Sequence, residues 1–256
     1  MLALLPKVFP RGSPSTVQQH LLLELCIFTV VMSTRPPFAT AVYQRLPDTT
    51  VSSLLKASEK CSQELWPGPL WRTSALLGIS QELFDIAFRL AQLRRRLPLD
   101  ITDQFKLAKL DVRLTLWRAP ELGSPPIGLK LTATLFHLAC SLFCYKISQP
   151  SLQADNLLVR PIMQKAIEIL AQIPIAQLAA PVMAWPVLIL SFGAWTDREK
   201  KALRSPFEYQ ESYYGMGNAT KALGLMEFIW TLDGSKEGVA TLDGLISDKY
   251  LTFIPL

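Results

Sequence analysis

Residues 155–174 read DNLLVRPIMQKAIEILAQIP, and the spacing of their apolar side chains indicates the fold class. Apolar residues return every three or four positions, which is the period of an α-helix with one buried face. Asp155 or Asn156 is placed to cap the start of this helix, and Pro174 ends it. The stretch therefore predicts an amphipathic helix whose buried face consists of Val159, Ile162, Ala166, Ile169 and Ile173.

The same period recurs on both sides of this stretch. One segment follows a candidate cap at Ser80, and Pro98 separates it from a second segment that begins at Asp100. A third begins at Asn218, which is also a favourable capping residue. The predicted inward faces of these three helices are Leu83, Ile86, Leu90 and Leu93; Leu107, Leu110, Leu114 and Trp117; and Ala222, Leu225, Ile229 and Leu232.

Together these segments predict an all-α protein. A strand-like alternation occurs only in residues 250–254. No polar or glycine-rich linker divides the chain, so we expect an irregular N-terminus over residues 1–15 and one helical domain over residues 16–256. That domain should contain roughly nine to eleven helices joined by short, proline-punctuated loops. Further helices are expected over residues 16–32, 51–64, 129–147, 182–195 and 197–214.

Composition and charge exclude several classes of protein. Half of the residues are apolar and 18% are charged, which excludes an intrinsically disordered chain. A net charge of +5 is too small for a dense nucleic-acid-binding surface. The basic runs at residues 94–96 and 198–201 are interpreted as solvated helix ends, in preference to phosphate contacts. We identify no helix with several Arg, Lys, Asn or Gln side chains on one face, so we expect no sequence-specific DNA binding by this chain.

The cysteines predict neither disulfides nor a metal site. They are Cys26, Cys61, Cys140 and Cys144, and no two of them form a C-x-x-C pair. Cys140 and Cys144 lie on one face of a predicted helix without further ligands at metal spacing. We interpret all four as free core thiols in a reducing compartment. The N-terminus also lacks the basic region and cleavage site of a signal peptide.

No catalytic, cofactor-binding or metal-binding residue is predicted. His20 and His137 lie far apart, without a carboxylate at helical spacing, and His137 is interpreted as a core residue with a satisfied hydrogen bond. Asp100 and Asp103 could hold a magnesium ion only with more aspartates nearby, so a helix cap and a first-turn acid is the preferred interpretation.

The sequence GMGNATK at residues 215–221 is also interpreted structurally. It lacks the third glycine of a dinucleotide fingerprint, the Gly-Lys-Ser/Thr of a phosphate loop, and the strand that precedes both motifs. We expect Gly215 to end one helix, a turn through Gly217, and Asn218 to cap the next helix.

Three apolar stretches raise the alternative of a membrane protein. Residues 21–32 are too short to span a bilayer, residues 131–147 contain His137, and residues 178–195 contain Pro181 and Pro186. Buried helices of a large helical domain have the same hydropathy, so we expect no membrane association.

The order of several short motifs is more informative than any single residue. Residues 185–194, WPVLILSFGA, resemble the "WPLFIAGCEA" segment of fungal-specific transcription factor domains, the helical regions C-terminal to Zn2Cys6 DNA-binding modules. That family continues with an Asp/Glu-Arg helix, a Gly-x-Gly-Asn-type turn and a helix that ends in Trp. The matching residues here are 197–199, 215–218 and Trp230.

Earlier pieces follow in the same order. Residues 25–37 resemble the family's "LF.YHDVLSSTTFGRPP" helix and turn, residues 76–83 its "LLGLPRELL" turn, and residues 131–145 its central "A..LYL" helix. The resemblance thus covers nearly the whole chain. Two departures stand out: these residues contain no six-cysteine zinc module, and Thr34-Arg35 precedes the Pro-Pro pair where the family has glycine.

The resemblance implies a non-enzymatic nuclear regulator of transcription, acting without cofactors and without its own DNA reader, on genes such as a secondary-metabolite cluster. Its partners would be proteins of the transcription machinery or a DNA-binding regulator, together with a possible small-molecule effector. A helical small-molecule-binding protein or biosynthetic enzyme is a second hypothesis, based on the apolar composition and six tryptophans. A membrane protein is the third.

Overall fold

The computed structural model describes residues 56, 81–94, 96–118, 127–178, 183–214 and 217–233. Within these ranges there are eight α-helices and no strands, which confirms the all-α class for this part of the chain. The helices are α4 (Gln81–Arg94), α5 (Ile101–Leu116), α6 (Ile127–Ser148), α7 (Val159–Leu170), α8 (Ile175–Leu178), α9 (Ala184–Ser191), α10 (Asp197–Tyr214) and α11 (Gly217–Asp233).

Several sequence predictions fall outside the described residues. The helix expected over residues 16–32, the cap at Ser80, the strand-like residues 250–254 and the boundary after residue 15 all do so. Of the helix expected over residues 51–64, the structure describes only Lys56, which is helical.

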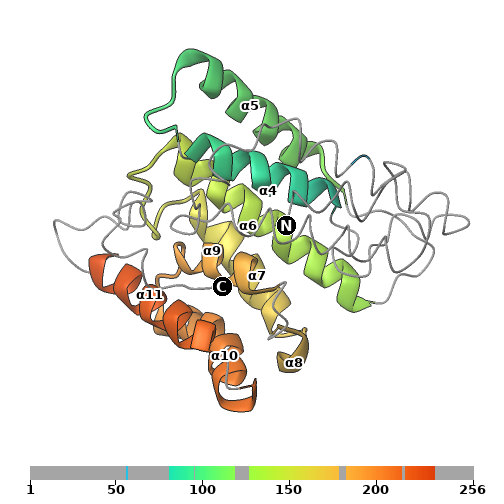
Figure 1. The fold of residues 1–256 in the computed structure, drawn as a ribbon, viewed down its shortest axis with the longest axis vertical. Helices are drawn as coiled ribbons and strands as arrows, with labels where there is room; N and C mark the ends of the chain where they lie inside the picture. Colours follow the sequence, from blue (N-terminus) through green and yellow to red (C-terminus); the bar gives the residue numbers. More distant parts are fainter. Residues whose placement is uncertain are drawn as a thin grey trace, which may run out of the picture.

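Helix α6 lies at the centre of the arrangement. It packs against α4 and α5 on one side and against α7 and α9 on the other (Figure 1). Helix α10 packs against α7, α8 and α9, and α11 lies against both α9 and α10. Within the described ranges, α6 has the length and mean hydropathy of a membrane span over Lys130–Ser148, but more than half of that window is buried in the protein. Its position among four helices is that of a core helix.

An aromatic cluster joins α4, α6 and α9. The Phe84 ring lies 5.1 Å from that of Phe136, and the Phe136 ring stacks on Trp185 with centroids 5.9 Å apart. Phe143 meets the same indole edge-on at 6.1 Å. Trp185 is only 5% exposed, so its indole is part of the core.

Helix α9 begins as the sequence predicts but ends early. Pro186 is the third residue of the helix, where the backbone N–H would have no intrahelical partner in any case. The expected continuation to Trp195 is wrong, because α9 ends at Ser191. The next two amides, of Phe192 and Gly193, bond to carbonyls three residues back and tighten the last turn into a 3₁₀ form.

The chain then passes close to α7 at Gly193. A Cβ built on Gly193 would lie 2.8 Å from the Met163 Sδ and 3.0 Å from the Val159 Cγ1. Both neighbours are fully buried, and Val159 is β-branched and stiff. The same segment accepts a hydrogen bond from Arg160 to the Gly193 carbonyl at 3.2 Å. This approach therefore requires a residue without a side chain.

Helix α10 begins with a reciprocal cap. The Thr196 Oγ1 accepts a hydrogen bond from the Glu199 amide at 3.3 Å, and the Glu199 carboxylate accepts one from the Thr196 amide at 3.0 Å. The same carboxylate accepts from the Trp195 amide and pairs with Arg160 of α7. Burial opposes ionisation of Glu199, but the hydrogen bonds from Arg160 and from the two amides prevail and lower its pKa.

The predicted caps of the other helices have mixed outcomes. Asp100 caps α5 as predicted, with its carboxylate 2.7 Å from the Asp103 amide. Neither Asp155 nor Asn156 is the N-cap of α7, because that position is Leu158 and it has no side-chain cap. Asn156 instead accepts from the Leu158 amide two residues ahead, which turns the chain into the helix.

The cap predicted for α11 is wrong. Its first helical residue is Gly217, so Asn218 lies inside the helix and no turn passes through Gly217. A cap at Asn218 would make Ala219 the first helical residue, so the helix begins two residues earlier than the capping rule predicts. Gly215, the predicted helix end, lies outside the described residues.

Replacing Trp185 with alanine should destabilise the protein by about 3–5 kcal/mol, the usual cost of emptying a buried aromatic site. The loss arises because Phe136 and Phe143 would both line the cavity. Urea denaturation followed by circular dichroism measures the effect. A denaturation midpoint equal to that of the wild-type chain would show that the indole is not part of the core.

Replacing Gly193 with alanine should destabilise the protein by about 1–3 kcal/mol, because the new methyl group overlaps Met163 and Val159. The matched control is Gly224→Ala in α11, where a Cβ meets nothing within 4 Å. That variant should be more stable than wild type by about 0.5–1 kcal/mol, since alanine favours a helix interior. Equal effects of the two substitutions in chemical denaturation would contradict the close approach at Gly193.

Candidate functional site

Helix α5 is apolar on two faces. Its inner face places Leu107, Leu110 and Leu114 in the core, as predicted. An amphipathic helix at the edge of a domain would be polar on the opposite face. On α5 that face instead carries four large apolar side chains, which are Ile101, Phe105, Val112 and Leu116, with exposed fractions of 86%, 61%, 56% and 70%. We call these four residues the α5 stripe.

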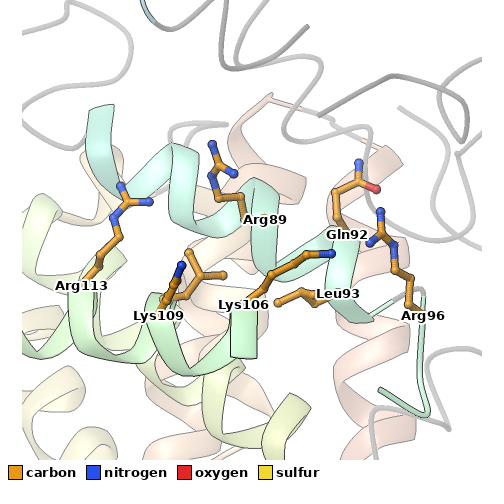
Figure 2. A pocket seen from close by; sticks show the side chains of 8 residues that line it. Arg89, Gln92, Leu93, Arg96, Lys106, Lys109 and Arg113 are labelled. Atoms are coloured by element: carbon orange, nitrogen blue, oxygen red, sulfur yellow. The ribbon is translucent and has the colours of Figure 1, made fainter. Parts of the chain in front are cut away.

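A pocket of about 210 Å³ lies between α4 and α5 and is lined mainly by cations. Figure 2 shows the side chains of the two helices converging on this space. Leu93 and Leu110 supply its apolar lining and Gln92 an amide. The cations that line it, here called the basic pocket, are Arg89, Arg96, Lys106, Lys109 and Arg113.

Carboxylates from both helices hold most of these cations in place. Asp85 of α4 pairs with Arg89 at 2.9 Å and, across the helices, with Arg113 at 2.8 Å. Asp103 of α5 accepts from Lys106 at 2.7 Å and from Arg96 at 3.2 Å. The hydrogen bond from Lys106 is the main reason why the pKa of Asp103 lies below its ordinary value.

One cation of the basic pocket has no recorded carboxylate partner among the described residues. Lys106 and Arg96 share Asp103, and Glu82 adds a contact to Arg113 at 3.3 Å, whereas no ion pair is recorded for Lys109. The ammonium of Lys109 lies 4.4 Å above the ring of Phe105. That cation–π contact joins the basic pocket to the α5 stripe.

This cluster was not predicted from the sequence. Of the basic run at residues 94–96, Arg94 is buried and Arg96 lines the pocket, whereas Arg95 lies outside the described residues. The statement that no helix carries several basic side chains on one face is wrong, because Lys106, Lys109 and Arg113 follow one another at helical spacing on α5. That spacing could have predicted the part of the cluster on α5. The contribution of Arg89 depends on tertiary packing, so no sequence pattern could have predicted it.

A second hollow lies on the other side of α5. It has a volume of about 680 Å³ and lies between α5, the end of α6 and the segment at residues 97–99. Apolar side chains form more than half of its lining, and the polar residues are Gln104, Asp111, Tyr145, Ser148 and Gln149. Burial and the neighbouring Asp111 carboxylate raise the pKa of Tyr145, which keeps its phenol protonated as a hydrogen-bond donor. We call this hollow the α5–α6 groove.

The residues considered for catalysis or metal binding have structural roles. The ring of His137 lies 5.0 Å from that of Trp117, and its Nε2 is 2.9 Å from the Leu114 carbonyl. Burial lowers the pKa of His137, so the neutral imidazole donates that hydrogen bond at neutral pH. His20 lies outside the described residues.

The two described cysteines are free and buried. Burial raises the pKa of both thiols, and that of Cys144 to about 12, so neither is a reactive thiolate. This confirms the interpretation of Cys140 and Cys144 as core thiols, whereas Cys26 and Cys61 are not described. No three His, Cys, Asp or Glu side chains in the described ranges lie close enough to share a metal ion.

Comparison with known proteins gives one match. The family model described as "Fungal specific transcription factor domain" matches residues 6–241. Comparisons with curated proteins and with solved structures found no match. The match covers most of the chain and includes the motifs noted in the sequence. The family is one of transcription regulators and not of enzymes, and on this match the chain belongs to the fungal-specific transcription factor domain family.

Proposed function

We propose that these residues form the regulatory domain of a nuclear transcription regulator that reaches its target genes through a protein partner. Membership of the family supports a role in transcription. The observation that carries the partner-dependent part is the outer face of α5. Base readout requires polar side chains against base edges, whereas this exposed face is apolar. Of the cations beside it, Lys106 and Arg113 already pair with carboxylates.

We also propose that the regulated genes form a secondary-metabolite cluster, as the sequence resemblance suggests. Comparing transcripts of a strain that lacks the gene with those of its parent would test this. Scattered transcript changes without a clustered set would contradict it. This proposal about the regulated genes is independent of the proposal that a protein partner recruits the chain to DNA, and the transcript comparison tests it alone.

This chain should not select a DNA sequence. When the purified chain is mixed with a pool of random duplexes at about 150 mM salt, unspecific phosphate contacts are partly screened. We expect retention that falls with salt and enriches no sequence. Enrichment of one sequence by a factor of about 1,000, the low end for specific binders, would overturn the partner-dependent model.

A small-molecule effector is a second proposal, and the α5–α6 groove supports it. Its volume of about 680 Å³ lies within the usual range for ligand pockets, and a lining of apolar side chains with a few polar groups is typical of them.

A ligand at about 100 times its Kd should stabilise the chain by about 2.7 kcal/mol, visible as a higher melting temperature in a screen of lipophilic small molecules. Ala108→Trp, which fills the groove wall, should abolish that shift. Gln164→Trp on the exposed face of α7 is the matched control. A ligand that shifts all three proteins equally would bind elsewhere, and a screen without any shift would remove the proposal.

A further inference from the structure

We propose that the outer face of α5 docks an amphipathic acidic helix of a partner protein. This inference rests on the proposed function, because it identifies the chemistry of the partner that a regulator without DNA readout requires. The apolar side of the partner helix covers the α5 stripe, and its carboxylates meet the basic pocket.

The α5 stripe has the geometry of a helix-docking surface. Its residues lie at positions i, i+4, i+11 and i+15, which fall on one side of an α-helix. They extend over about 22 Å, the length of roughly four helical turns. Four neighbouring large apolar side chains exposed along one helix are unusual on a monomeric soluble protein and mark an interaction surface.

The basic pocket fixes the charge of the partner. Lys106, Lys109 and Arg113 project from the flank of α5 that faces α4, where Arg89 and Arg96 join them. The contact of Lys109 with the Phe105 ring places the nearest cation directly beside the stripe. A helix that buries Phe105 therefore brings its own flanking residues to Lys109, and only carboxylates are complementary there.

The pairs with Asp85 and Asp103 support binding. They restrict the rotamers of Arg113, Lys106 and Arg96 before the partner arrives, so less side-chain entropy is lost on association. Lys109, for which no carboxylate partner is recorded in the described part of the chain, leaves positive charge beside Phe105 for the partner to neutralise. The opposite flank of α5 is different, since Gln104, Asp111 and Thr115 offer no cation.

Three other occupants fit less well. A free phosphate or carboxylate would neutralise the cations but leave the stripe exposed to water. DNA would have to place its backbone against four apolar side chains. A second copy of this chain, paired antiparallel through α5, would place the two basic flanks on the same side of the helix pair, where they repel each other.

The experiment measures binding of helical peptides to the full-length purified chain by fluorescence anisotropy. The probe is a 20-residue peptide with leucines at i, i+3, i+4 and i+7 spacing and glutamates on the flanks of that face. One control peptide has the same composition in scrambled order, and another has lysines in place of the glutamates. We expect a Kd on the order of 10 µM for the probe and binding at least about tenfold weaker for both controls.

Variants of exposed residues locate the site. Phe105→Ala and Val112→Ala should each weaken binding of the probe about tenfold through lost apolar contact. Lys109→Glu should weaken it by a similar factor and reduce its dependence on salt. Ile175→Ala and Lys201→Glu, which change exposed residues of α8 and α10, should leave binding unchanged. Because all five side chains are exposed, each variant should melt within about one degree of wild type.

Each contrary result has a definite meaning. Equal binding of the three peptides, or none at about 1 mM, overturns the proposal. So does a 20-base-pair duplex that displaces the probe at lower concentration, which would assign the face to DNA. Light scattering that shows a dimer for wild type and a monomer for Phe105→Ala would assign it to a second copy. A melting temperature lowered by several degrees in Phe105→Ala would show that the chain itself covers the stripe. Failure here is distinct from failure of the proposed function, which the DNA-selection assay tests without any peptide.

Discussion

The stacking of Trp185 on Phe136 is the contact on which the rest of the described structure depends. Phe136 lies at the middle of α6, which holds α4 and α5 on one side, and Trp185 begins α9, against which α10 and α11 pack. The two rings thus lie between two groups of helices. Their burial removes a large apolar area from water and fixes the orientation of α9. The positions of α10 and α11 follow from that orientation.

The segment from Trp185 to Glu199 shows why the family motif has its particular order. Its residues make contacts with several other helices. The carbonyl of Ser191 accepts from the Trp230 indole of α11 at 3.0 Å, and Gly193 admits α7. Glu199 caps α10 and receives Arg160 from α7. Four helices therefore converge on fifteen residues, and substitution at any of these points changes a backbone contact as well as a side chain. The motif residues therefore have a structural role, since they join helices.

The helical period predicted the buried faces well, because the apolar pattern within a single helix is enough to identify the face that it buries. Leu83, Ile86, Leu90 and Leu93 are all buried, and so are Leu107, Leu110 and Leu114. Helix ends were predicted less well, since they depend on what the neighbouring chain offers. Asn156 uses its side chain for a turn, and α9 ends at the point where the chain must pass α7.

Only the part of the basic pocket that lies on α5 could have been predicted from the sequence, for a different reason. Arg89 and Arg113 are 24 positions apart in the chain, and each is accompanied by acids that hide the excess charge in any local count. Asp85 illustrates this: beside Arg89 it looks like half of a neutral pair within one helix. In the structure it also binds Arg113, so one carboxylate serves two guanidinium groups. A charge cluster built from two helices can be identified only when the packing of the two helices is known.

The outer face of α5 is unfavourable in water when nothing covers it. A purely structural edge helix would gain solubility from polar residues at positions 101, 105, 112 and 116 without losing any core contact, because its inner face already buries three leucines. The apolar side chains at these four positions contribute little to folding while they remain exposed. Carboxylates orient the cations beside them, and the packing of α5 on its neighbours does not require these carboxylates. Exposed apolar side chains and pre-oriented charge have a common use when another surface completes them, and this is why α5 is the place to look for the partner of this domain.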